Sequence, residues 1–102
     1  MNILFITPSV VQPLNGGIER ITYSLSEILK TDYGYGCFFW NLQLGDDMQE
    51  VESLIRNNHI EIVVAQGADK RISQLLSSIR DVIGKLDWKA SLLFVFHSNP
   101  GV

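Results

Sequence analysis

The 102-residue chain has few of the features that most often indicate a ligand or a cellular location. Its single cysteine, Cys37, excludes an internal disulfide and a cysteine-rich metal site, and we interpret it as a small buried apolar residue. Eight basic residues against eleven acidic ones give a net charge of −3, and the basic residues are scattered, so no positive patch for nucleic acid or an anionic membrane is encoded. No apolar run approaches the roughly 20 residues of a membrane span, and the segment after Met1 is too short for a signal peptide. We therefore expect a soluble, cytoplasmic protein.

What the chain does have is the composition and periodicity of a folded α/β protein. Hydrophobic residues make up 46% and charged residues 19%, which is ordinary for a globular domain. Short apolar runs predict four strands, at 2–6, 37–42, 60–67 and 91–96. Helical spacing of apolar residues predicts helices at about 18–30, after Asp46-Asp47, and at about 69–86. The first of these helices has one apolar stripe, which consists of Ile18, Ile21, Leu25, Ile28 and Leu29.

The strict alternation of strands and helices predicts a Rossmann-like α/β/α architecture. Four continuously apolar strands are typical of a parallel sheet that is covered on both faces. We expect the strand order 3-2-1-4, which would place the fourth strand beside the first. The sequence stops at "SNPGV", in a loop directly after a strand, so we expect residues 1–102 to be part of a domain rather than a complete one.

Ligands of such sheets bind at the carboxyl ends of the strands, where the strand order reverses. In the expected order, the loop with Gly16-Gly17 and the loop that starts at His97 would flank one crevice. Glycine amides at a helix N-terminus can approach a phosphate closely, although the local sequence alone favours a tight turn for the glycine pair. Asn15 suits either interpretation, Glu19 would repel a phosphate, and Arg20 would compensate only if it faced the crevice.

Other residues near the predicted strand ends are candidates for lining the same crevice. These are Gln66 and Gly67 after the third strand, and Ser98 and Asn99 after His97. Asp46-Asp47 is interpreted as a helix start rather than a metal or catalytic pair. The chain contains neither a GxGxxG fingerprint nor a P-loop, and no spacing typical of a metal site or a catalytic triad.

Two segments resemble a known enzyme family. The stretch "MNILFITPSVVQPLNGGIERITYSLSEIL" resembles the amino-terminus of the retaining glycosyltransferases of family 4, which have the GT-B fold. The family's first strand is followed by a Gly-Gly loop, often extended as GGIER, and residues 16–20 match this motif at every position. The ending "VFHSNPG" also resembles the family, which carries a histidine where this chain has His97.

The resemblance implies the amino-terminal, acceptor-side domain of a hexosyltransferase with two Rossmann-like domains. It implies that Gly16 and Gly17 approach the phosphates of a nucleotide-sugar donor, that His97 contacts the transferred sugar, and that no metal or other cofactor is required. For the intact enzyme, the resemblance also implies a sugar or a lipid-linked acceptor and a role in cell-envelope polysaccharide biosynthesis. It implies a cytoplasmic enzyme that can lie at the inner face of the membrane.

The chain also departs from the family's pattern. The pair of glutamates that the family carries in its second domain is absent, and Gly34-Tyr35-Gly36-Cys37 replaces the usual Gly-His-Glu-Val. We therefore expect no transfer activity from this chain alone. The alternative is a non-catalytic flavodoxin-like or receiver-like binding module, although Thr7-Pro8-Ser9 offers neither a receiver's acidic residues nor a flavin phosphate loop. The strand at 91–96 is expected to form an exposed edge through which copies of the chain self-associate.

Overall fold

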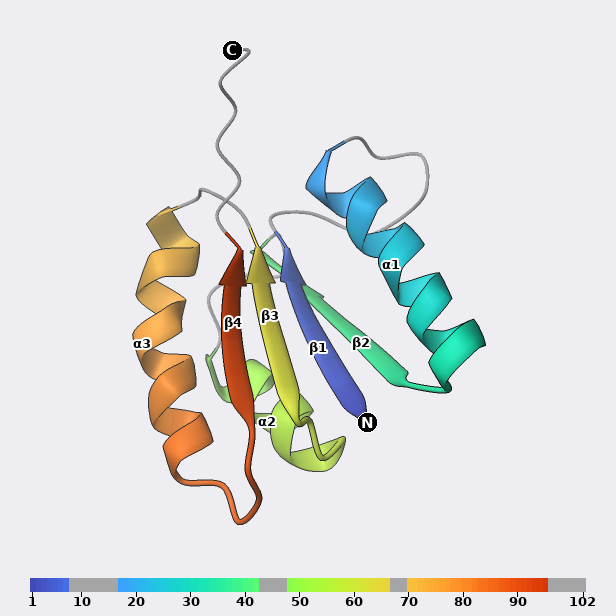
Figure 1. Cartoon of the computed structure of the whole chain (residues 1–102). Helices are drawn as coiled ribbons and strands as arrows, with labels where there is room; N and C mark the ends of the chain where they lie inside the picture. The colour runs from blue at the N-terminus through green and yellow to red at the C-terminus, as the bar shows by residue number, and fades with distance from the viewer. Residues whose placement is uncertain (8–16, 43–47, 67–69, 96–102) are drawn as a thin grey trace.

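The computed structural model of the chain describes residues 1–7, 17–42, 48–66 and 70–95. It contains four strands and three helices in these residues, which are β1 (Asn2–Thr7), α1 (Ile18–Tyr33), β2 (Gly36–Asn41), α2 (Met48–Asn57), β3 (Ile62–Gln66), α3 (Lys70–Gly84) and β4 (Ser91–Val95). All four strands are parallel and form one sheet. The predicted Rossmann-like α/β class is confirmed, with helices on both faces of the sheet (Figure 1).

The strand order is β2-β1-β3-β4, so the expected order 3-2-1-4 is wrong. Strand β1 lies between β2 and β3, with Ile6 opposite Trp40 on one side and opposite Ala65 on the other. Strand β4 pairs with β3 and is separated from β1 by it. The expected adjacency of the first and fourth strands therefore does not exist.

The order follows from the faces that the helices cover. Helix α1 packs on one face while the chain moves outward from β1 to β2, and α2 packs on the opposite face. Because connections between parallel strands are right-handed, a helix on the opposite face carries the chain back past β1, so that β3 pairs with its free side. The expected order would require α1 and α2 to share a face.

The main core lies between the sheet and the helices α2 and α3. Sheet residues that point to this side include Leu4, Ile6, Trp40 and Val63, and all four are 1% exposed or less. They pack against apolar residues of the two helices, which include Val51, Ile55, Leu75, Ile79 and Val82. The apolar stripes of these two helices therefore behave as the sequence predicts, since alternate strand residues and helical i, i+3, i+4 positions meet in one layer.

Helix α1 packs on the sheet differently from the sequence-based expectation. Its sheet-facing side is formed by Glu19, Thr22 and Ser26, which are all 9% exposed or less. Three residues of its apolar stripe, Ile21, Leu25 and Ile28, remain 59%, 44% and 50% exposed. Small polar residues let the helix approach β2 closely, as the 3.8 Å hydrogen bond from the Cys37 thiol to a backbone carbonyl of α1 shows. The apolar stripe of α1 thus lies on the flank of the helix.

Candidate functional site

The sheet has a topological switch point between β1 and β3. These strands are neighbours, yet the chain proceeds from β1 to α1 on one face and from β3 to α3 on the other. In open α/β sheets the connections at such a switch point diverge, and ligands bind in the crevice at the carboxyl ends of the two strands. Any functional site of this fold is expected first at this position.

The N-terminus of α1 lies at the carboxyl end of the sheet and begins at a glycine (Figure 1). Gly17 is the N-cap residue, with φ +65° and ψ −131°, and its carbonyl accepts the first helical hydrogen bond from Ile21 N–H at 3.2 Å. A Cβ on Gly17 would meet no atom within 4 Å, so glycine is required here for its backbone conformation rather than for space. Gly17 offers no side-chain acceptor to the amides of the first turn, and amides at a helix N-terminus are a favourable position for an anion.

Four polar residues are buried beneath this helix start. Thr7 ends β1, Gln66 ends β3, and Glu19 and Thr22 come from the first two turns of α1; each is 9% exposed or less. Gln66 donates from Nε2 to Thr22 Oγ1 at 2.7 Å, which joins the end of β3 to α1. We call Thr7, Glu19, Thr22 and Gln66 the crevice cluster.

The crevice cluster follows from strand and helix periodicity. Thr7 continues the alternation of Ile3 and Phe5 on the α1 face, and the register that pairs Ile6 with Ala65 brings Thr7 beside Gln66. On α1, Glu19 lies three residues before Thr22, so both share the sheet-facing side of the helix.

Some predicted site residues belong to this arrangement and others do not. Gly17, Glu19 and Gln66 are brought together at the switch point. Arg20 is exposed and lies about 200° around α1 from Thr22, on the side of the helix away from the sheet. The remaining predicted residues, Asn15, Gly16, Gly67, His97, Ser98 and Asn99, lie outside the described residues.

The expected pairing of the Gly-Gly loop with the loop after β4 is also corrected. Strand β3 lies between β1 and β4, so the ends of those two strands are about 10 Å apart rather than adjacent. The neighbour of β1 at the switch point is β3, and Gln66 takes the position that was expected for the residues after the fourth strand.

Two members of the crevice cluster, Thr7 and Thr22, were not predicted from the sequence. A signal for Thr22 exists: Glu19, Thr22 and Ser26 recur at spacings of three and four and form a second, polar stripe on α1. The apolar stripe beside it was the stronger pattern, and only the packing of α1 shows which stripe faces the sheet.

The chemistry of the site is that of hydrogen bonding to an oxygen-rich ligand. The first-turn amides of α1 are donors with partial positive charge, which suits phosphate oxygens. The Glu19 carboxylate accepts hydrogen bonds and favours hydroxyl groups, but it disfavours a second negative charge in contact with it. The site can therefore hold a phosphate at the helix start and hydroxyl-bearing groups at the crevice cluster.

The lone cysteine lies away from this crevice, on β2 beneath α1. Burial raises the pKa of the Cys37 thiol above its ordinary value of 9.0, the positive charge of Lys30 opposes this, and the negative charge of Glu27 adds to it. A raised pKa keeps the thiol protonated at neutral pH, and the protonated thiol is a weak nucleophile.

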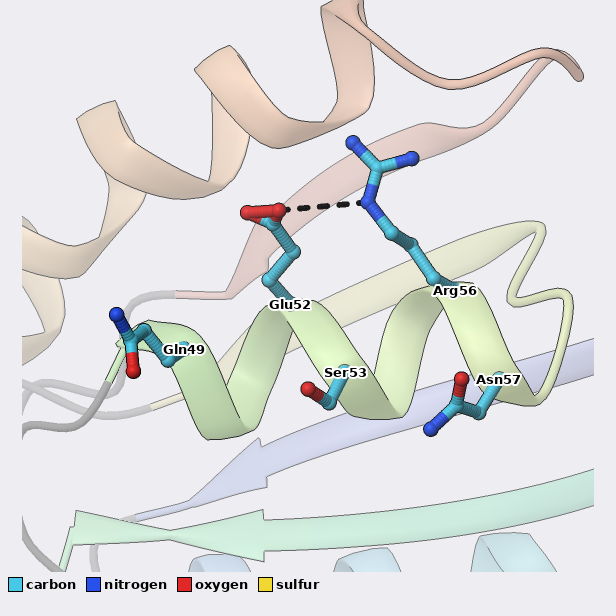
Figure 2. A pocket seen from close by; sticks show the side chains of 5 residues that line it. All are labelled: Gln49, Glu52, Ser53, Arg56 and Asn57. Carbon is cyan, nitrogen blue, oxygen red and sulfur yellow. Dashed lines mark hydrogen bonds and ion pairs between the residues drawn. The ribbon is translucent and has the colours of Figure 1, made fainter.

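A second hollow lies on the outer side of α2. It has a volume of about 410 Å³, and Figure 2 shows its five lining side chains, Gln49, Glu52, Ser53, Arg56 and Asn57, all on one helix. Glu52 and Arg56 pair with each other at 3.3 Å, one helical turn apart, and both are about 41% exposed. Such a pair is an ordinary stabilising contact on a helix surface.

Residues 1–7, 17–42, 48–66 and 70–95 contain no group of three or more side chains arranged to hold a metal ion. In the same part of the chain, no helix combines the length and the apolarity needed to cross a membrane. No protein-family model matches the chain, and no curated protein or solved structure is significantly similar to it. The residues and their geometry are therefore the basis for a functional conclusion.

Proposed function

We propose that this chain is the amino-terminal, acceptor-side part of a retaining glycosyltransferase that uses a nucleotide-sugar donor. The observation that carries the proposal is the glycine-initiated helix α1, which starts without a side-chain cap from Gly17 and carries part of the buried crevice cluster at the switch point of the sheet. The sequence "GGIER" at this helix start is the motif in which the resemblance to the GT-B glycosyltransferases is strongest.

In this proposal the two parts of the site have different tasks. The amide groups at Gly17 and the first turn of α1 hydrogen bond with the donor's diphosphate, and they stabilise the charge that develops as the diphosphate departs. Glu19 accepts hydrogen bonds from sugar hydroxyl groups, and the Gln66–Thr22 hydrogen bond holds α1 against β3 so that these groups keep their positions. The catalytic glutamates and most of the donor site belong to a second Rossmann-like domain, so this chain by itself is inactive in transfer.

The partners follow from the same proposal. The acceptor is a sugar or a lipid-linked sugar, and the intact enzyme acts in the cytoplasm or at the inner face of the membrane, in the synthesis of a cell-envelope polysaccharide. No metal ion takes part in the proposed reaction.

The reading frame of the gene tests the proposal directly. Beyond Val102 we expect a second Rossmann-like half with two glutamates seven residues apart. A stop codon directly after Val102 would refute the glycosyltransferase assignment.

Calorimetric titration of the 102-residue chain with uridine, guanosine and adenosine diphosphate sugars provides a second test. We expect weak binding that inorganic pyrophosphate competes for and that Gly17→Ala reduces, whereas Gly84→Ala, which changes a glycine in α3, leaves it unchanged.

The strand order favours a second candidate, a non-catalytic flavodoxin-like binding module. The order β2-β1-β3-β4 is that of the first four strands of flavodoxin-like sheets, whose switch point also lies between β1 and β3. Against it, the residues after β1 do not form the Ser- and Thr-rich loop that a flavin phosphate requires. Including flavin mononucleotide in the same titration separates the two candidates. Tight binding of the flavin, with no nucleotide-sugar binding that pyrophosphate competes for, would favour the binding module.

A further inference from the structure

Among the described residues, Glu19 is the only buried side chain that carries a charge. It is 9% exposed, although it belongs to the first turn of α1. Within the described ranges, its carboxylate takes part in no hydrogen bond and no ion pair. The two basic residues of α1 lie elsewhere, Arg20 on the side away from the sheet and Lys30 over the ring of Phe39, 5.7 Å from its centroid. A buried charge without a partner is costly, so we expect a ligand to pair with this carboxylate.

The hydrogen bond between Thr22 and Gln66 fixes where Glu19 lies along the sheet. Gln66 is the last residue of β3, and its Nε2 donates to Thr22 Oγ1 at 2.7 Å. Glu19 is three residues nearer the helix start, which is about 4.5 Å farther along the axis, and helical side chains tilt toward the N-terminus. The helix start lies at the carboxyl end of the sheet (Figure 1). Glu19 therefore reaches past the end of β3 at the switch point, where ligands of such sheets bind.

The chemistry around Glu19 favours an uncharged ligand that bears hydroxyl groups. The other members of the crevice cluster, Thr7, Thr22 and Gln66, are uncharged, so Glu19 supplies the only charge of the cluster. An ionised carboxylate only accepts hydrogen bonds, and its two oxygens can accept from two neighbouring hydroxyl groups. A carboxylate on the ligand would instead bring two like charges together in a poorly hydrated place. The charge of the ligand is therefore the property to which this side chain responds most strongly.

We propose that Glu19 determines the class of sugar in the donor: the site takes a neutral hexose with free hydroxyl groups and rejects a hexuronic acid. This inference rests on the proposed function, in which the first turn of α1 holds the donor's diphosphate. The sugar is bonded directly to that diphosphate, and Glu19 follows Gly17 by two residues, about 3 Å along the helix axis. One donor can therefore reach the helix start with its diphosphate and Glu19 with its sugar.

The diphosphate does not change this choice. Glu19 also repels the diphosphate, but every donor carries the same group, so this repulsion lowers the affinity for all donors alike. A comparison of two donors that differ only in the charge of the sugar removes it. The ratio of their two dissociation constants then measures how strongly the site distinguishes a neutral sugar from an acidic one.

Calorimetric titration of the protein expressed from its complete reading frame tests the inference with matched donors. One pair is uridine diphosphate glucose and uridine diphosphate glucuronic acid; the other is guanosine diphosphate mannose and guanosine diphosphate mannuronic acid. Within each pair, the sugars differ only in the carboxylate that replaces a hydroxymethyl group. In whichever pair binds, we expect the neutral donor to bind about tenfold more tightly or better, because like charges in contact are strongly unfavourable.

Glu19→Gln keeps the shape of the side chain and removes its charge. The two donors of a pair should then bind with nearly equal affinity, because the hexuronic acid donor gains affinity while the neutral donor loses some. Glu50→Gln is the matched control, since Glu50 also lies in the first turn of a helix but is exposed on α2, on the opposite face of the sheet. It should leave the ratio unchanged. A variant that merely disturbed the fold would weaken both donors in the same proportion.

The outcomes separate this inference from the proposed function. Equal affinity of the wild type for the two donors of a pair would overturn the role of Glu19 and leave the proposed function standing. An unchanged ratio in Glu19→Gln would do the same, because other residues would then make the choice. Absence of binding by all four donors would instead overturn the proposed function, and this inference with it.

Discussion

The conformation of Gly17 leads to a prediction in which two glycines of the same chain behave in opposite ways. Gly17 has φ +65° and ψ −131°, whereas Gly84 at the end of α3 has no positive φ. At both positions a Cβ would meet no atom within 4 Å, so that alanine fits sterically at either. The two substitutions therefore differ only in the backbone conformation that alanine must adopt.

The magnitudes follow from known backbone energetics. Alanine at Gly17 must adopt a conformation that is nearly restricted to glycine, at a cost of about 1–3 kcal/mol, and the loss of unfolded-state freedom offsets about 0.4–1 kcal/mol of this. Alanine at Gly84 gains helix propensity and should raise the free energy of unfolding by about 0.5–1 kcal/mol. For a domain of about 100 residues, each kcal/mol corresponds to about 4–8 °C in Tm. The two Tm values should therefore lie on opposite sides of the wild-type value.

Urea and thermal unfolding, followed by circular dichroism, measure both variants under the same conditions. A Gly17→Ala variant that is as stable as Gly84→Ala would refute the assigned conformation, and with it the argument that glycine is required at the start of α1. If Gly17→Ala is destabilised as expected but binds pyrophosphate as tightly as the wild type, the conformation is correct and the phosphate role of the helix start is wrong.

Two further predictions concern buried groups. Thr22→Val leaves the buried Gln66 amide without its 2.7 Å acceptor and should cost about 1–3 kcal/mol in urea unfolding, whereas the double variant Thr22→Val/Gln66→Leu should recover most of this loss. Strictly additive losses in the double variant would contradict a direct interaction between the two side chains. The raised pKa of the Cys37 thiol means that the folded chain keeps its proton where the unfolded chain has lost it. Its contribution to stability is present below the ordinary pKa of 9.0 and is lost as the pH rises through the folded value. The Tm of the wild type should therefore fall relative to Cys37→Ser between pH 8 and 11; parallel curves would contradict a raised pKa.

The elements of this fold were predictable because each depends on local periodicity. The apolar runs and the helical patterns placed the four strands, α1 and α3 within about three residues of their observed bounds, and placed the start of α2 correctly after Asp46-Asp47. The strand order was not predictable in the same way. All four strands are continuously apolar, so the pattern did not distinguish the interior strand β3 from the edge strand β2.

The candidate site shows the same division. Gly17, Glu19 and Gln66 could be selected from the sequence because each stands where a predicted strand ends or a predicted helix begins. Thr7 and Thr22 join them only because of the β1–β3 register and the side of α1 that packs on the sheet. The loop after the fourth strand was expected at the crevice because the wrong order made β4 a neighbour of β1.

By itself, the sequence determined the class of the fold, the bounds of its elements and the glycine at the start of α1, since these depend on hydrophobic periodicity and on local backbone preference. Only the tertiary structure decided that α1 and α2 cover opposite faces of the sheet. Because they do, β3 lies beside β1 and the switch point lies between these two strands. It also turned the polar stripe of α1 toward the sheet and left Ile21, Leu25 and Ile28 exposed. Periodicity reveals that a helix has two distinct sides, but which side is buried depends on the strands and helices that surround it.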